Sequence, residues 1–299
     1  MLNTLRAVFG LLALCLNTLV HGLLLLLLAV PKLLTPEGPA RHRVRRWLTS
    51  VAESWIGVNN ALFSLASKTR WEQHLPEYLN QHGCYLVLCN HQSWVDIPVL
   101  QRCFNRRLPL LRFFLKKQLI WVPVLGPCWW ALDFPFMHRA SREELARKPE
   151  LRGRDLESAR RACEIFRDVP VAMMSFPEGT RRQGSKRQPG ADYQRLLPPK
   201  AGGVGQVIQA LGTELHGCVD VTIRYGAAGE DQEPPGMWTL LRGEIDLISI
   251  DAQLRPIPSA LLNRDFGSDK EAREALQEWL RGLWQEKDQL LGDQTTEGS

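Results

Sequence analysis

Two short apolar runs, each followed at once by polar residues, constrain the fold of this chain more than any other feature. Residues 85–89 (Tyr-Leu-Val-Leu-Cys) and 171–176 (Val-Ala-Met-Met-Ser-Phe) have the length and composition of buried strands. The polar residues at 90–96 and 177–182 begin where these runs end. Open α/β sheets place their ligands at the carboxyl ends of strands. The pattern therefore predicts an α/β domain with its functional residues along that edge.

The first polar segment contains a histidine and an aspartate separated by four residues, His91 and Asp96. Histidine is the side chain best suited to accept a proton near neutral pH. A carboxylate bonded to its δ nitrogen would fix the tautomer and stabilise the imidazolium. On one regular helix the two side chains would point about 140° apart. They can meet only if a turn intervenes and Asp96 lies in the first turn of the next helix. The alternative is a packed histidine and a helix-start aspartate without a shared role.

The second polar segment has the residues of an anion-binding turn. Gly179 permits a tight turn with backbone N–H groups free to approach an anion. Arg181 has a planar fork that matches phosphate oxygens, and Thr180 is a further donor. Glu178 is an acceptor when ionised and is suited to orienting an arginine or a substrate hydroxyl.

The N-terminus contains the longest apolar segment of the chain. Residues 7–30 are almost wholly apolar and long enough to cross a hydrocarbon core, which takes about 20 residues. Asn17, Thr18 and His21 interrupt the segment, so a helix pair that dips into one leaflet is an alternative to a spanning helix. Five basic residues lie between positions 32 and 46, and one precedes the segment. This asymmetry predicts that the rest of the chain lies on the cytoplasmic side.

The chain divides into five predicted parts: a membrane-embedded segment (1–31), a linker with an amphipathic helix (32–70), the main domain (71–265), a C-terminal amphipathic helix (266–291) and a disordered tail (292–299). Within the main domain further strands are expected at 219–225 and 243–250, and helices at 97–104, 155–167 and 202–211. Ser268 and Glu271 have the spacing of a capping box that opens the C-terminal helix.

The stretch 110–136 is rich in Trp, Phe, Leu and Pro and only lightly charged. Core packing accounts for most of it. The prolines and Gly126 break any long helix, however, and leave apolar surface that could line a groove or rest on lipid. The candidate groove residues are Trp121, Val124, Leu125 and Trp129. A strand-like piece at 134–139 closes the stretch and places Arg139 at its end.

Composition excludes several classes of protein. The net charge of +5 suits anionic headgroups, CoA phosphates or nucleic acid without choosing among them. The seven cysteines are scattered and lack Cys-x2-Cys spacing, which argues against disulfides and a zinc site and favours a reducing compartment. No metal site is expected. A nucleic-acid-binding function is not supported, because the basic residues lack interleaved aromatics on a recognisable fold.

Taken in order, Asn90-His91-x4-Asp96, Arg139 and Phe176-Pro177-Glu178-Gly179-Thr180-Arg181 resemble the motifs of the glycerolipid acyltransferases, the 1-acylglycerol-3-phosphate acyltransferase family. The resemblance covers about residues 70–225. The segments 196–200 (Leu-Leu-Pro-Pro-Lys) and 219–223 (Val-Asp-Val-Thr-Ile) are similar to the branch of lysocardiolipin acyltransferases and their bacterial relatives. The chain departs from the family pattern twice. Leu132-Asp133 stand where the second motif usually opens with glycine, and Asp220 or Thr222 stands where the fourth usually has proline. Both departures affect the inference about which substrate is used more than the inference about the reaction.

The resemblance implies an α/β acyltransferase domain with a mixed β-sheet flanked by helices. It implies transfer of a fatty acyl group from acyl-CoA, or from an acyl carrier protein, to the hydroxyl of a lysophospholipid in the membrane. His91 would be the general base and Asp96 would hold it. The acceptor phosphate would be bound by Arg139, Glu178, Gly179, Thr180 and Arg181. Trp121, Val124, Leu125 and Trp129 would line the acyl-chain groove. No tightly bound cofactor is expected. No serine or cysteine lies in a recognisable nucleophile setting, so direct transfer is expected.

The resemblance to bacterial relatives also implies a location at the cytoplasmic (inner) membrane, with the catalytic domain facing the cytoplasm. Three alternatives remain open from the sequence. The acceptor could be glycerol 3-phosphate, the reaction could be a CoA-independent transacylation between phospholipids, or the chain could be an inactive membrane lipid-binding protein.

Overall fold

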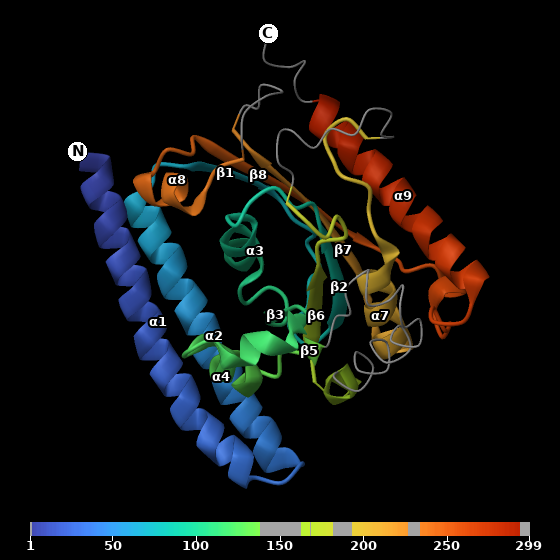
Figure 1. The fold of residues 1–299 in the computed structure, drawn as a ribbon, viewed down its shortest axis with the longest axis horizontal. Coiled ribbons are helices and arrows are strands. Elements are labelled where there is room, and N and C mark those ends of the chain that lie inside the picture. Colours follow the sequence, from blue (N-terminus) through green and yellow to red (C-terminus); the bar gives the residue numbers. More distant parts are fainter. Residues whose placement is uncertain (1, 138–162, 168, 182–192, 227–233, 294–299) are drawn as a thin grey trace.

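The computed structural model describes residues 2–137, 163–167, 169–181, 193–226 and 234–293 (Figure 1). Arg139 and most of the helix expected at 155–167 lie outside these ranges. Six residues of the predicted C-terminal tail also lie outside them, and the other two belong to the last helix.

A six-stranded sheet forms the centre of the domain, in the order β1-β8-β7-β2-β6-β3. Its strands are β1 (Arg70–His74), β2 (Cys84–Cys89), β3 (Leu111–Arg112), β6 (Val171–Ser175), β7 (Gly217–Tyr225) and β8 (Leu247–Arg255). Only β7 and β8 pair antiparallel, and all other neighbours are parallel. The predicted mixed α/β sheet is therefore confirmed. Because β2 pairs in parallel with both β6 and β7, the ends of these three strands lie at one edge.

Side-chain alternation along the strands divides the core into two layers. One layer joins residues such as Val87 and Val221 to α3 (Asp96–Phe104). The other joins residues such as Leu86 and Cys218 to α7 (Ala201–Leu211) and α9 (Lys270–Asp293). Figure 1 shows α7 and α9 on the opposite side of the sheet from α3. The helices expected at 97–104 and 202–211 are confirmed within one residue, whereas β8 begins four residues later than expected.

Shorter elements connect these layers. They are β4 (Leu115–Lys116), which pairs with β5 (Phe136–Met137), α4 (Leu125–Ala131), α8 (Met237–Arg242) and the 3-10 turns η1 (Lys117–Trp121), η2 (Glu164–Arg167), η4 (Gly212–Glu214) and η5 (Ser259–Leu261).

The N-terminal residues form a helical hairpin of α1 (Leu2–Leu34) and α2 (Pro39–Ala66), which lie side by side in Figure 1. The polar residues that interrupt the apolar segment bond across this hairpin. Asn17 Nδ2 donates to Asn59 Oδ1 at 2.8 Å, and Trp55 Nε1 donates to Thr18 Oγ1 at 3.2 Å. The polar residues that interrupt the apolar segment therefore hold α1 against α2.

A buried ion-pair network joins this hairpin to the domain. Asp133 Oδ1 lies 2.6 Å from Lys32 Nζ of α1, and Oδ2 lies 3.3 Å from Arg45 Nε of α2. Lys32 is only 2% exposed. Breaking a pair this deeply buried costs about 3–5 kcal/mol. Asp133 has φ +59°, a left-handed conformation that glycine adopts most readily and that aspartate tolerates better than most residues. The first departure from the family pattern thus places an aspartate in a left-handed turn, where it anchors both helices.

The capping box predicted at the start of the C-terminal helix is wrong. Helix α9 begins at Lys270, and Asp269 Oδ1 accepts the N–H of Ala272 at 3.0 Å. The hydroxyl of Ser268 donates instead to Asp265 at 2.6 Å. Aspartate caps a helix as well as serine does, and here it stands one residue nearer the helix.

Candidate active site

The turn between β2 and α3 brings His91 and Asp96 together. Strand β2 ends at Cys89, and Asp96 is the first residue of α3. His91 Nδ1 lies 2.8 Å from Asp96 Oδ2. The predicted turn, and the placement of Asp96 in the first turn of the following helix, are confirmed.

Asp96 is fully buried and acts purely as an acceptor. Besides His91, its Oδ2 accepts the backbone N–H groups of Gln92 at 2.7 Å and Ser93 at 2.9 Å. Its Oδ1 accepts the hydroxyl of Tyr225 at 2.6 Å. Four donors match the acceptor capacity of an ionised carboxylate.

The His91 ring is held between this carboxylate and an aromatic ring. It stacks on Phe176, with ring centroids 4.0 Å apart and planes 14° from parallel. Because the carboxylate accepts, Nδ1 carries the proton and Nε2 keeps a lone pair. The His91 side chain is 15% exposed, so the ring lies at the rim of the core. This arrangement leaves Nε2 able to accept a proton.

Strand β7 secures the residues beside His91. Asn90 is fully buried and exchanges two hydrogen bonds with the backbone of Ile223, at 2.8 and 2.9 Å. Gln92 Nε2 donates to the same carbonyl at 2.6 Å. These amides hold the turn against the end of the neighbouring strand.

Glu178, predicted to bind the phosphate, is 1% exposed, and its two oxygens accept backbone N–H groups from His91 at 2.9 Å and from Leu197 at 3.1 Å. The carboxylate therefore joins the turn after β2 to the segment that precedes α7, and its role in phosphate binding stays a prediction.

Two cations lie at the turn after β6: Arg181 belongs to the turn, and Lys200 reaches it from the residue before α7. Gly179 has φ +69°, and its N–H donates to the carbonyl of Phe176 at 2.9 Å, so this N–H closes the turn instead of facing an anion as expected. Arg181 stacks on the exposed ring of Trp94, with Cζ 4.3 Å from its centroid. Lys200 Nζ donates to the carbonyl of Glu178 at 3.0 Å. Thr180 is exposed beside them.

Sequence reasoning assigned no role to Lys200 or Tyr225. The sequence feature that could have identified Lys200 is its position just before the helix predicted at 202–211. The feature that could have identified Tyr225 is its position at the end of a strand predicted to be buried. Neither feature reveals the partner, since each pairing joins residues far apart in the chain.

The candidate groove residues lie near the N-terminal hairpin. Val124 and Trp129 pack on a cluster that includes Leu25 of α1 and Leu48 of α2. Trp121 is 85% exposed, and Leu125 is half-buried. The acyl-chain groove remains a prediction.

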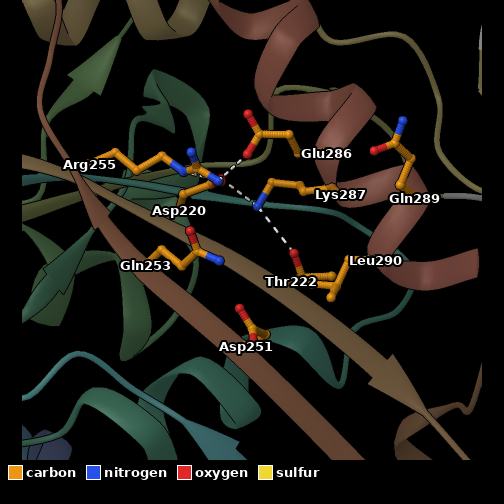
Figure 2. A pocket seen from close by; sticks show the side chains of 9 residues that line it. All are labelled: Asp220, Thr222, Asp251, Gln253, Arg255, Glu286, Lys287, Gln289 and Leu290. Carbon is orange, nitrogen blue, oxygen red and sulfur yellow. Dashed lines mark hydrogen bonds and ion pairs between the residues drawn. The ribbon is translucent and has the colours of Figure 1, made fainter. Parts of the chain in front are cut away.

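The second departure from the family pattern lies on the far face of the sheet. Asp220 of β7 points away from α3, with its Oδ1 2.5 Å from Lys287 Nζ of α9 and its Oδ2 3.2 Å from Arg255 Nε. These side chains line a cavity of about 250 Å³. Figure 2 shows Lys287 and Arg255 directed toward Asp220. Asp220 therefore attaches α9 to the sheet, on the face opposite α3.

Three acyltransferases from three organisms are similar to this chain in sequence. The chain is 24% identical over 253 residues to the yeast (Saccharomyces cerevisiae) 2-acyl-1-lysophosphatidylinositol acyltransferase, covering 72% of this chain and 62% of that protein. It is 26% identical over 160 residues to the 1-acyl-sn-glycerol-3-phosphate acyltransferase of Haemophilus influenzae, covering 54% and 56%. It is 23% identical over 264 residues to lysocardiolipin acyltransferase 1 of Gallus gallus, covering 82% and 63%. The chain thus spans less than two thirds of the length of these relatives.

The fold is shared with a solved structure. The 1-acyl-sn-glycerophosphate acyltransferase PlsC of Thermotoga maritima superposes with a TM-score of 0.54 at 16% identity, covering 96% of this chain and 98% of that one. The family model described as Acyltransferase matches residues 70–226, which contain both polar segments. The chain therefore belongs to the acyltransferase family.

Proposed function

We propose that this protein transfers a fatty acyl group from acyl-CoA, or from an acyl carrier protein, to the free hydroxyl of a lysophospholipid such as lysophosphatidate. The observation that carries the proposal is the contact of 2.8 Å between His91 Nδ1 and Asp96, together with a neighbouring turn that contains Arg181 and is contacted by Lys200. The relatives that act on lysophosphatidylinositol and on 1-acyl-glycerol 3-phosphate support this acceptor class.

In the proposed reaction His91 Nε2 takes the proton of the acceptor hydroxyl as its oxygen attacks the thioester carbonyl. The new C–O bond forms, the C–S bond breaks, and the leaving thiolate receives the proton from the imidazolium. Asp96 holds the ring and balances its charge during the step. General base catalysis of this kind contributes about 10²–10⁴ in rate.

The neighbouring side chains favour direct transfer over a covalent acyl-enzyme. Cys89 is fully buried, and burial raises the pKa of its thiol well above the usual value, so it is not available as a thiolate. The hydroxyl of Ser93 donates to the carbonyl of Pro235. Cys89 and Ser93, the cysteine and serine nearest His91 in the sequence, are thus both buried, which disfavours either as a nucleophile.

Arg181 and Lys200 are the proposed partners of the acceptor phosphate. The guanidinium of Arg181 lies over the ring of Trp94, a contact that would limit its motion while its N–H groups bind phosphate oxygens. Thr180 and the turn at Gly179 shape the cradle, and Arg139 is a further proposed contact outside the described residues. Holding the phosphate would place the hydroxyl against His91.

The exposed face of α1 is the proposed membrane contact. Among the residues described, α1 is long and apolar enough to cross a membrane, with a mean hydropathy of 2.4 in an 18-residue window of Asn3–Leu34. Its outward face is a continuous stripe at helical spacing in which every side chain is at least 50% exposed: Leu5, Phe9, Leu12, Leu16, Leu19, Leu23, Leu27, Val30 and Leu34. The opposite face packs on α2, which carries Arg41, Arg43 and Arg46.

We infer that this stripe enters one leaflet and that α1 does not cross the bilayer. Lys32 near one end of α1 is paired with Asp133, and Gly10 near the other end lies against Leu241 of α8. A spanning α1 would draw these attached elements into the hydrocarbon. The basic residues of α2 favour the cytoplasmic side of the inner membrane.

Replacing His91 with alanine should lower kcat by about 10²–10⁴, because the proposed base is lost. Transfer of a labelled acyl group from acyl-CoA to lysophosphatidate measures this effect, and vesicle flotation and thermal unfolding should be unchanged. Unaltered turnover in the variant would eliminate the base role. The same assay with glycerol 3-phosphate, or without acyl-CoA, separates the alternative acyltransferase reactions, and no transfer in any format would favour the inactive lipid-binding protein.

Replacing Arg181 with alanine should raise KM for lysophosphatidate by at least about tenfold, since a hydrogen bond to a charged group contributes about 1.5–3 kcal/mol. KM for monoacylglycerol, which lacks the phosphate, should stay within about twofold. The control is Arg70→Ala, which removes an exposed guanidinium paired with Glu72. A wild-type KM for lysophosphatidate would contradict the phosphate assignment.

Replacing Glu178 with glutamine should lower kcat about tenfold and leave KM for lysophosphatidate within about twofold. The amide NH2 would face a backbone N–H donor of His91 or Leu197 and loosen the catalytic turn. Glu244→Gln, at a surface pair with Arg242, is the control. A rise in KM without a change in kcat would return Glu178 to the phosphate site.

Replacing Leu16 and Leu23 together with glutamate should reduce binding to vesicles at least about tenfold, because both side chains lie on the exposed stripe of α1. Leu254→Glu, at an exposed position on β8, is the matched control. Full retention of vesicle binding in the double variant would exclude the stripe as the contact.

A further inference from the structure

We propose that Tyr225 is a positioning residue that orients Asp96, and through it the imidazole of His91. The inference deepens the proposed function and rests on it, since Tyr225 would act on the proposed base pair without touching substrate. Its hydroxyl lies 2.6 Å from Asp96 Oδ1.

The register of β7 brings this hydroxyl to the site. Strand β7 alternates between the two faces of the sheet, so Val221, Ile223 and Tyr225 share the face that packs against α3. Asp220 points to the α9 face. A slip of one residue would exchange the two faces and replace Tyr225 with Arg224. Tyr225 pairs with Ile248 of the antiparallel neighbour β8, so the sheet itself fixes the position of the phenol.

The contact completes the restraint on the carboxylate. The other three donors, from His91, Gln92 and Ser93, all bind Oδ2. Rotation about the Cβ–Cγ bond, a torsion with a broad energy profile, moves both oxygens together, so the bonds to Oδ2 and the bond to Oδ1 oppose it jointly. The Tyr225 hydroxyl supplies the one restraint on Oδ1 among these four donors, and it comes from a different strand. Because Oδ2 is also the partner of His91 Nδ1, the orientation of the carboxylate plane sets the orientation of the imidazole.

The phenol is suited to remain a donor. Tyr225 is buried, and burial followed by the charge of Asp96 raises the pKa of its hydroxyl well above the ordinary value. The hydroxyl therefore keeps its proton while the proposed base works, and it does not take the substrate proton. The hydroxyl contributes by orienting Asp96, so its loss should change kcat more than KM.

A second tyrosine in the same core layer offers a matched control. Tyr85 of β2 is as deeply buried as Tyr225 and belongs to the same cluster. Its hydroxyl, however, accepts the backbone N–H of Asn80 at 3.3 Å. Tyr225→Phe and Tyr85→Phe therefore each remove one buried hydroxyl from one cluster, and only the first touches Asp96.

The test compares these two variants in the full-length protein. We expect Tyr225→Phe to lower kcat about tenfold with KM for lysophosphatidate within about twofold, and Tyr85→Phe to leave both within about twofold. The Tm of each variant, measured by thermal unfolding, shows whether the substitution has weakened core packing in general. Equal kcat values for Tyr225→Phe and the wild type, or equal losses in the two variants, would overturn the inference.

A second measurement does not depend on turnover. The imidazole ¹⁵N shifts of His91, assigned by their disappearance in His91→Ala, report which nitrogen carries the proton and the strength of its bond. We expect these shifts to change in Tyr225→Phe and to stay constant in Tyr85→Phe. Unchanged shifts in both variants would count against positioning. Changed shifts in a protein that transfers no acyl group would leave the positioning intact and refute the proposed function.

Discussion

The buried carboxylate of Asp96 is the interaction on which the rest of the site depends. A charged group with no access to water persists only when donors surround it, and here the donors come from two places. His91, Gln92 and Ser93 belong to the turn after β2, and Tyr225 belongs to β7. The carboxylate therefore joins two neighbouring strands and the first turn of α3. Its four hydrogen-bond partners restrain the turn after β2.

Two other carboxylates, one partly buried and one buried, attach the peripheral helices through ion pairs. Asp133 binds Lys32 and Arg45 and so fixes the N-terminal hairpin, and Asp220 binds Lys287 and so fixes α9. Both stand where the sequence departs from the family pattern. A buried ion pair adds little net stability but makes wrong arrangements costly, because a misplaced helix would leave a charge unpaired. The departures thus specify how the accessory helices dock, and neither contacts the catalytic turn through an observed bond.

The docking of the hairpin has a consequence for the proposed reaction at a membrane. One face of α1 is occupied by α2, α4 and α8, and the other presents an uninterrupted apolar stripe. Helix α8 begins two residues after Pro235, whose carbonyl accepts the hydroxyl of Ser93 in the turn after β2. A short chain of contacts therefore leads from the proposed lipid-facing helix to the proposed base. This arrangement suits a substrate whose hydroxyl lies at the bilayer surface.

The sequence by itself determined the strands at 85–89 and 171–176, the turn that brings His91 to Asp96, and the apolar character of α1. These features follow from local composition and from the geometry of short segments. The tertiary structure alone decided that Glu178 bonds His91 and Leu197, that Tyr225 bonds Asp96, and that Lys200 joins the turn at Gly179. Each of these contacts joins segments distant in the chain, and strand order and register set which residues meet. A one-residue change in register would alter every such partner while leaving the local pattern of the sequence unchanged.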